Sequence, residues 1–214
     1  MNNNNQLINI NQNAKSALIK SKNLLDITRK ILEKKELIKS FEFKPFLIKE
    51  KGHLDSVWSV IISPDGKYII SGSSDNTIKI WDIKTAVCLK TLEGHSVSSV
   101  TISPDGKYIV SGSYDKVVIK IWDIKTGECL NSLEGHSNSV NSVTISPDGK
   151  YIISGSSDNT IKIWDIKTGE CLNTLEGHSD CVNSVVISPD GKYIVSGSAP
   201  ADSFGHLARS IRTV

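Results

Sequence analysis

Histidine, serine and aspartate recur together along this chain of 214 residues, and these three residue types can form the triad of a hydrolytic enzyme. Such a triad needs an exposed serine at a cleft, with a basic histidine and an oxyanion hole beside it. Here the combination occurs three times at matching places, and each time a tryptophan follows. Because one small chain has no use for three identical catalytic centres, we interpret these residues as structural. We predict no catalytic residue and no enzymatic activity.

The segment SPDGK, which occurs four times, is the other candidate for chemistry. It lacks the GxxxxGKS/T frame of a phosphate-binding loop and the acidic ladder of an EF-hand, and it is typical of a hairpin turn. The chain contains no HExxH, GxSxG or GxGxxG motif, no CxxC pair and no His/Cys cluster at zinc spacing. We therefore predict no metal and no cofactor.

A long internal repeat carries all of these residues. The letters GSSDNTIKIWD stand at 72–82 and again at 155–165, and a near copy, GSYDKVVIKIWD, stands at 112–123. The first and third units differ at only seven of 42 positions. A period of this length indicates an array of similar structural units. Four units follow one another, the last of them partial: 52–93, 94–134, 135–176 and 177–198.

Each complete unit predicts four short strands. SVWSVII is followed by the turn SPDG, in which proline presets φ and glycine accepts a positive φ. KYIISGS is the second strand, and TIKIWD, which alternates apolar and polar residues, is the third. The segment IKTGE then turns the chain into CLNTLE, the fourth. Four antiparallel strands in each repeat of 41 or 42 residues are the pattern of a propeller blade.

These features resemble the WD40 repeat family of β-propeller proteins. Gly-His at the start of each unit and Trp-Asp near the end of the complete ones carry the resemblance, which covers residues 52–198. It implies an all-β fold of WD40-type propeller blades, as a partial or oligomer-completed propeller, to which we add an N-terminal α-helical leader. It also implies a non-catalytic scaffold for protein–protein interaction.

The resemblance further implies one buried tetrad in each complete unit. In the family pattern the Asp accepts from the His, the His meets the Ser, and the Ser meets the indole N–H. The fourth unit keeps His178 and Ser196 but has Pro200 in place of the Asp, so its tetrad is broken. The three complete sets are His53, Ser71, Asp75 and Trp81; His95, Ser111, Asp115 and Trp122; and His136, Ser154, Asp158 and Trp164.

Positions that vary between nearly identical units are candidates for binding, because the shared residues serve the blade. The first unit departs from the third mainly around the loop that opens the first strand, which in propellers of this kind rims the top of the central channel. Trp58 and Tyr114 are the expected anchors, since binding hot spots favour Trp, Tyr and Arg. The alternative is drift among duplicated units, with Trp58 packed on a neighbouring blade. The candidate partner-binding residues are Leu54, Asp55, Trp58, Tyr114, Asn141 and Asn183.

The segment before the repeats differs in character. Residues 1–13 are rich in Asn and are expected to be disordered. Residues 14–40 carry leucines seven apart amid Lys and Glu, which predicts an amphipathic helix. This helix would pair as a short coiled coil, or lie on the propeller or on an acidic partner. Residues 41–51 are a candidate closing strand.

The sequence leaves closure of the propeller open. Residues 199–214 form a tail that does not resemble the repeat, so the fourth unit is expected to supply only two strands. The array then falls short of the roughly four to eight blades typical of propellers, and its end faces would expose apolar surface. Two chains could complete one ring, the chain could be a fragment of a longer protein, or the tail could close a tight four-bladed ring.

Composition and charge limit the classes of partner that this chain is expected to bind. Residues 1–51 contain eleven Lys/Arg against five Asp/Glu, whereas 52–214 contain fourteen against eighteen, and an acidic repeat region argues against nucleic acid. No apolar run is long enough to span a membrane, and no signal peptide is visible. Three of the four cysteines share one repeat position, which favours reduced thiols in a cytoplasmic, intracellular protein.

The predicted partners are other proteins or peptides, together with self-association that completes the propeller, and neither nucleic acid nor membrane. Two alternatives remain for the function. The repeats could be the regulatory or sensor part of a larger multidomain NTPase or kinase. They could also form a propeller enzyme, although the sequence shows no unrepeated reactive pair.

Overall fold

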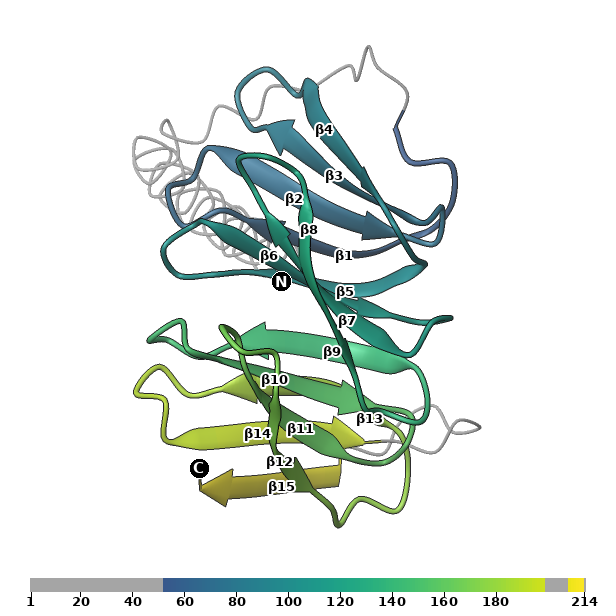
Figure 1. Ribbon diagram of the computed structural model, residues 1–214, viewed down its shortest axis with the longest axis vertical. Coiled ribbons are helices and arrows are strands. Elements are labelled where there is room, and N and C mark those ends of the chain that lie inside the picture. The colour runs from purple at the N-terminus through teal and green to yellow at the C-terminus, as the bar shows by residue number, and fades with distance from the viewer. Residues whose placement is uncertain (1–51, 199–207, 214) are drawn as a thin grey trace, which may run out of the picture. The chain divides into compact units, whose positions relative to one another are not determined.

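The computed structural model describes residues 52–198 and 208–213. The predicted disordered leader at 1–13, the helix at 14–40 and the candidate closing strand at 41–51 all lie outside these residues. Within them, β-strands are the only regular elements, which confirms the predicted all-β fold. The strands form three four-stranded sheets and one three-stranded sheet, which we call blades 1 to 4 in chain order (Figure 1).

Each of the first three blades is an antiparallel meander in which strands adjacent in sequence pair with each other. Blade 1 contains β1 (Val57–Ile62), β2 (Tyr68–Ser73), β3 (Thr77–Asp82) and β4 (Cys88–Glu93). Blade 2 contains β5 (Val97–Ile102), β6 (Tyr108–Ser113), β7 (Val118–Asp123) and β8 (Cys129–Glu134). Blade 3 contains β9 (Val140–Ile145), β10 (Tyr151–Ser156), β11 (Ile161–Asp165) and β12 (Cys171–Leu175). Blade 4 contains β13 (Val182–Ile187), β14 (Tyr193–Ser198) and β15 (Ala208–Thr213).

The SPDG segment forms the turn between the first two strands of each blade. Gly66 has a φ of 68°, in the left-handed region that glycine adopts without a steric penalty. The Ser63 hydroxyl donates to Asp65 Oδ1 at 2.7 Å and accepts the amide of Tyr68 at 2.9 Å. The segment therefore satisfies its own polar groups, as expected of a hairpin turn.

Neighbouring blades pack through a glycine on the second strand. A Cβ atom on Gly72 would lie 2.4 Å from a methyl of Val97, and one on Gly155 would lie 2.6 Å from a methyl of Val182. Only glycine allows this approach, which explains the repeated SGS segment. The contacts bury an apolar core between successive blades, with Ile70 and Val97 in the first such cluster.

The third strand of blade 4 corrects the expectation that this unit supplies only two strands. β15 pairs antiparallel with β14 from Tyr193 opposite Thr213 to Ser198 opposite Ala208. An unpaired strand edge offers a row of backbone donors and acceptors, and these bind any extended segment without requiring the repeat sequence. The segment ARSIRT contains neither Pro nor Gly, so it can fill that edge.

Candidate partner-binding site

In blade 3, a chain of hydrogen bonds joins the four side chains of the third set. The Trp164 indole N–H donates to Ser154 Oγ at 2.8 Å, Ser154 Oγ lies 2.7 Å from His136 Nε2, and His136 Nδ1 lies 2.8 Å from Asp158 Oδ2. An indole N–H can only donate and an ionised carboxylate can only accept. The Ser154 hydroxyl therefore donates to Nε2 of a neutral His136 imidazole, and Nδ1–H of the same ring donates to Asp158. Blade 1 contains the same chain at 2.8, 2.7 and 2.9 Å: Trp81, Ser71, His53 and Asp75.

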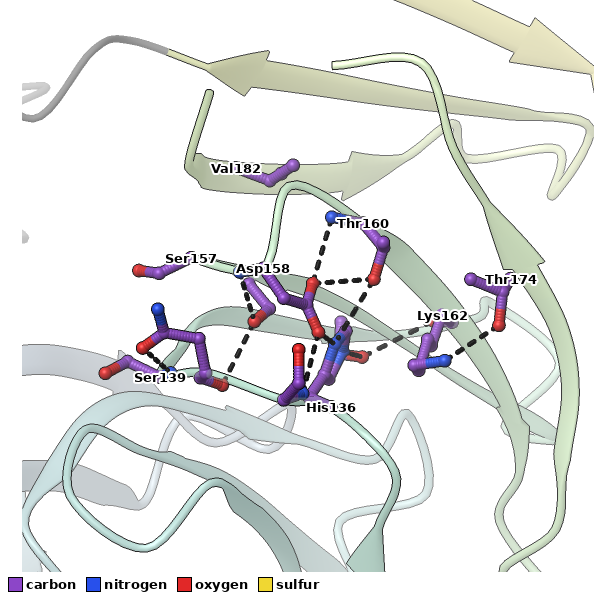
Figure 2. Close-up of polar contacts among 12 residues, drawn as sticks. His136, Ser139, Ser157, Asp158, Thr160, Lys162, Thr174 and Val182 are labelled. Carbon is purple, nitrogen blue, oxygen red and sulfur yellow. Dashed lines mark hydrogen bonds and ion pairs between the residues drawn. The ribbon is translucent and has the colours of Figure 1, made fainter. Parts of the chain in front are cut away.

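Asp158 is held as an anion at the end of this chain. Burial by itself raises the pKa of Asp158, but hydrogen bonds from Thr160, the Ser137 amide and His136 outweigh it and lower the pKa to about 2. Thr160 Oγ1 donates at 2.7 Å and the Ser137 amide at 2.9 Å. Figure 2 shows the Asp158 carboxylate between His136 and Thr160. Burial also lowers the pKa of His136, against the opposing effect of Asp158, so the imidazole is neutral.

Blade 2 departs from the predicted second tetrad. The Trp122 indole N–H does donate to Ser111 Oγ, at 2.9 Å. His95, however, is almost fully buried, and neither of its ring nitrogens has a hydrogen-bond partner among the described residues. Asp115 is exposed, and it accepts instead from the hydroxyl of Ser113 at 3.0 Å. Only one of the three expected contacts is therefore present in this blade.

The second tetrad is incomplete because the spacing between its residues differs from that in the other two units. Two residues fewer separate His95 from the first strand than separate His136 from its own, and the turn after Asp115 is one residue longer. That turn also contains Lys-Val-Val where the other units contain Asn-Thr, so it lacks the threonine that clamps the carboxylate. Burial, followed by the positive charge of Lys120, lowers the pKa of His95 to about 4, although the negative charge of Asp115 and, after it, the Gly112 carbonyl oppose the shift.

The serines of these sets are placed for structure. Ser71, Ser111 and Ser154 are all buried, and each accepts the N–H of its tryptophan. A nucleophile must meet its substrate at a cleft, whereas Ser111 and Ser154 lie inside their blades. Ser71 borders a hollow on blade 1, but its hydroxyl is bonded to both Trp81 and His53. In blades 1 and 3 the arrangement instead ties the second and third strands of the blade to the loop before its first strand.

The first strand of every blade carries a β-bulge at one position. Its pairing with the second strand skips one residue in each blade, and that residue is Trp58 in blade 1. A bulge redirects the side chain that it contains. The matching residues of the other blades are Ser98, Asn141 and Asn183.

The bulged residues meet at one place. Together with Tyr114 they line an open hollow of about 350 Å³: Trp58, Ser98, Asn141 and Asn183. Four of the six residues selected from sequence variation thus lie around one hollow. Leu54 and Asp55 are exposed in the loop before β1, and they do not line it. Trp58 is 67% exposed, so most of its side chain is not covered by a neighbouring blade.

Hydrogen bonds hold several of these groups in position. The Trp58 indole N–H donates to Ser74 Oγ at 2.6 Å, and the Asn141 amide donates to Ser157 Oγ at 2.9 Å and to the Val182 carbonyl at 3.1 Å. The side chain of Tyr114 is 65% exposed, and the backbone at this residue is held because its carbonyl accepts from the Ser139 hydroxyl at 2.6 Å. Fixed anchors lose little freedom when a partner binds.

Sequence reasoning overlooked two features of this site. One is the clamping role of Thr77 and Thr160, which was readable from the DNT segment that the first and third units share. The other is the bulge, which is a property of the pairing between two strands. No single residue of the first strand specifies the bulge.

Comparison with known proteins identifies the family. A family model described as "WD domain, G-beta repeat" matches four segments that together make up more than half of the chain: 44–82, 86–123, 127–165 and 169–203. The chain belongs to the WD40 repeat family. Membership in this family indicates a protein-interaction scaffold built from propeller blades.

Individual relatives match over about one repeat. "Ribosome biogenesis protein BOP1 homolog" of Drosophila grimshawi is 54% identical over 43 residues, which is 20% of this chain and 6% of that relative. The protein of the same name from Drosophila melanogaster is 51% identical over 43 residues, with the same coverage. The match therefore spans only a small fraction of these relatives.

Three further findings concern the described part of the chain. It contains no helix long and apolar enough to cross a membrane. Between 52 and 198 and in 208–213, no group of three or more His, Cys, Asp or Glu side chains is placed to hold a metal ion. The four cysteines all lie in this part and are free thiols.

Proposed function

We propose that this chain is a non-catalytic scaffold that binds proteins or peptides at the hollow formed by the bulged residues. One observation carries the proposal: four blades direct the same variable position to one place, where two exposed aromatic side chains stand beside two asparagines. Residues that build the blades repeat in every unit, whereas the bulge position holds Trp in the first unit, Ser in the second and Asn in the third and fourth. Variation at a position that several blades direct to one place is expected of a surface that recognises a specific partner.

The chemistry of the lining favours a polypeptide ligand. All five lining residues are uncharged, so phosphate groups would find no cation among them. Trp58 and Tyr114 present flat apolar surface of the kind that dominates binding energy at protein interfaces. The Asn183 side-chain amide can donate to a peptide carbonyl, and the Ser98 hydroxyl oxygen, whose own proton is directed to the carbonyls of Gly112 and Val140, can accept from a peptide N–H. Leu54 and Asp55 would then contact a partner larger than the hollow itself.

A quantitative capture experiment tests this proposal. The purified full chain and the double variant Trp58→Ala/Tyr114→Ala are immobilised, and bound proteins from the same lysate are measured by mass spectrometry. We expect a set of proteins bound by the unchanged chain to fall about tenfold or more with the double variant, because two anchors are lost. Both side chains are exposed, so the fold should survive their removal.

The matched control removes exposed apolar side chains elsewhere. Leu130 and Leu172 lie on the outermost strands β8 and β12 and are about half exposed. The variant Leu130→Ala/Leu172→Ala should bind the same proteins as the unchanged chain. Equal recovery by all three proteins would show that the hollow is not the binding site. Turnover of ester, peptide or glycoside substrates would contradict the non-catalytic part of the proposal.

Ribosome biogenesis, which appears in the names of the relatives, is not part of the proposal. The matched segment has about the length of one blade, and blade sequences are shared widely within the family. A fold shared with another protein does not establish a shared function.

A further inference from the structure

The first strand of each blade buries its valines against the preceding blade, except in blade 1. Val100, Val143 and Val185 occupy one matching position and are only 5, 5 and 3% exposed. Val60 is the residue at that position in blade 1, and it is 61% exposed. The same sequence position is therefore a core residue three times and a surface residue once.

Val60 belongs to a continuous apolar surface on blade 1. Val57 and Ile62 on the same strand are also about half exposed. Val57, Val60 and Trp81 line a hollow of about 350 Å³ whose walls are mostly apolar. We call this surface the leading face, and it consists of Val57, Val60, Ile62, Ile69 and Trp81.

Blade 4 presents the complementary surface at the other end of the array. Gly72, Gly112 and Gly155 each lie so close to a valine of the next blade that an added Cβ would meet it at 3.0 Å or less. Gly197 is the matching residue of blade 4, and nothing lies within 4 Å of the position of its Cβ. We call this surface the trailing face, and it consists of Val186, Val195 and Gly197.

Val186 distinguishes the trailing face from an ordinary surface. Its position is occupied by Ile61 in blade 1, which packs against the core between blades 1 and 2, and by Thr101 in blade 2 and Thr144 in blade 3. In blade 4 it is a valine, and that valine is 53% exposed. An added apolar residue beside an unfilled glycine site is what a further blade would bury.

We propose that the leading face of one copy of this chain binds the trailing face of a second copy. The two faces are the two halves of an interface that the chain already makes between blades 1 and 2, 2 and 3, and 3 and 4, where it buries an apolar cluster each time. The contact joins different surfaces, so a copy has one of each to offer. Two copies joined at both ends would form a closed ring of eight blades, within the roughly four to eight that propellers contain.

Light scattering during size-exclusion chromatography of the full chain gives the first test. We expect one species near twice 23.4 kDa. A monomer at every concentration, or particles of no fixed size, would overturn the proposal. Val60→Lys should weaken the dimer by about 100-fold or more, because the contact would then bury an unpaired charge. Gly197→Trp should do the same by filling the site that a valine enters.

Both substitutions leave the isolated chain able to fold, because Val60 is exposed and the space around Gly197 is open. Circular dichroism of each variant verifies this. The matched control is Leu172→Lys, which places the same charge on an exposed leucine of β12, and it should remain a dimer.

Mixing the two variants tests which faces meet. Each alone should be a monomer, but the Val60→Lys chain keeps a good trailing face and the Gly197→Trp chain keeps a good leading face. An equimolar mixture should therefore recover a one-to-one dimer held by a single intact contact. If Gly197→Trp alone remains a full dimer, the interface joins two leading faces and the proposal is wrong. If the mixture stays monomeric, the head-to-tail contact is also excluded.

Discussion

Blades 1 and 3 differ from blade 2 in the state of one buried histidine. In blade 3, His136 is bonded at both nitrogens, and Asp158 is clamped by a threonine. In blade 2, His95 is as deeply buried but unbonded among the described residues, and Asp115 is turned to solvent. All four residue types are present in both blades. The identity of the residues therefore does not make the network; the spacing that brings them together does.

The comparison also shows that a blade can form without its complete network. Blade 2 has four strands like its neighbours, and Trp122 is buried and bonded to Ser111. Blade 1 contacts one side of its first strand and blade 3 the other. In repeat proteins, neighbours contribute much of the stability of each unit. Packing therefore maintains blade 2, while its unsatisfied histidine lowers its stability.

The largest expected effect comes from removing the clamped carboxylate of blade 3. Asp158→Ala removes the acceptor of His136, Thr160 and the Ser137 amide, and the bonds from the first two are at least partly buried. We expect the free energy of unfolding to fall by about 3 kcal/mol. Urea titration followed by tryptophan fluorescence measures the change.

Asp115→Ala is the matched variant in blade 2. Its carboxylate is exposed and touches no histidine nitrogen within bonding distance, so we expect a loss of about 1 kcal/mol or less. Equal losses from the two variants would mean that the blades do not differ in the way described.

The blade architecture was predictable from sequence because its signals are local. TIKIWD was expected as a strand, and β3 runs over the same residues, Thr77–Asp82. Alternation and turn chemistry act within a few residues, so a repeat displays them directly. The open state of His95 was not anticipated, because the match of four residue types concealed a shift in the spacing between them.

Two other features depended on pairing between segments. The bulge that aims Trp58 at the hollow arises from the register of β1 against β2. The strand at Ala208–Thr213 forms because β14 has a free edge, and backbone edges accept many sequences. Such features become visible only once the strands are placed beside each other.

The second prediction uses pH to separate the blades. The pKa of His95 in the folded chain is lowered to about 4, below the ordinary value of 6.5. The unfolded chain therefore binds the proton more tightly, so stability is fully present above pH 6.5 and is lost as the pH falls toward 4. His95→Leu removes this titration. We expect the variant to lose about 2 kcal/mol less stability than the unchanged chain between pH 7 and pH 4.

His136 provides the contrast for the pH experiment. The pKa of His136 is also lowered, so His136 makes the unchanged chain and the His95→Leu variant less stable in acid to the same extent. This contribution cancels when the pH profiles of the two are subtracted. His136→Leu breaks two hydrogen bonds, so it should destabilise the chain at pH 7, whereas His95→Leu should not. Urea midpoints of the unchanged chain, His95→Leu and His136→Leu, measured at several pH values, test both expectations. Parallel pH profiles for the unchanged chain and His95→Leu would show that His95 is not buried neutral.

The smallest effect concerns the turn that replaces the clamp in blade 2. Val117 has a φ of 57°, a left-handed conformation in which a β-branched residue is strained. Blades 1 and 3 place Asn76 and Asn159 in this region, with φ of 66° and 69°. Asparagine tolerates it better, so Val117→Asn should raise the free energy of unfolding by about 1 kcal/mol. Thermal and urea unfolding both report the change.

The reciprocal exchange shows whether backbone strain is the cause. Asn159→Val puts the strained residue into blade 3 and should lower stability by about 1 kcal/mol, while Val117→Gly should stabilise about as much as Val117→Asn. If Val117→Gly destabilises instead, the valine side chain contributes packing that outweighs its strain. The longer turn of blade 2 would then be a stabilising feature in its own right, and the open His95 would be the only defect that separates this blade from its neighbours.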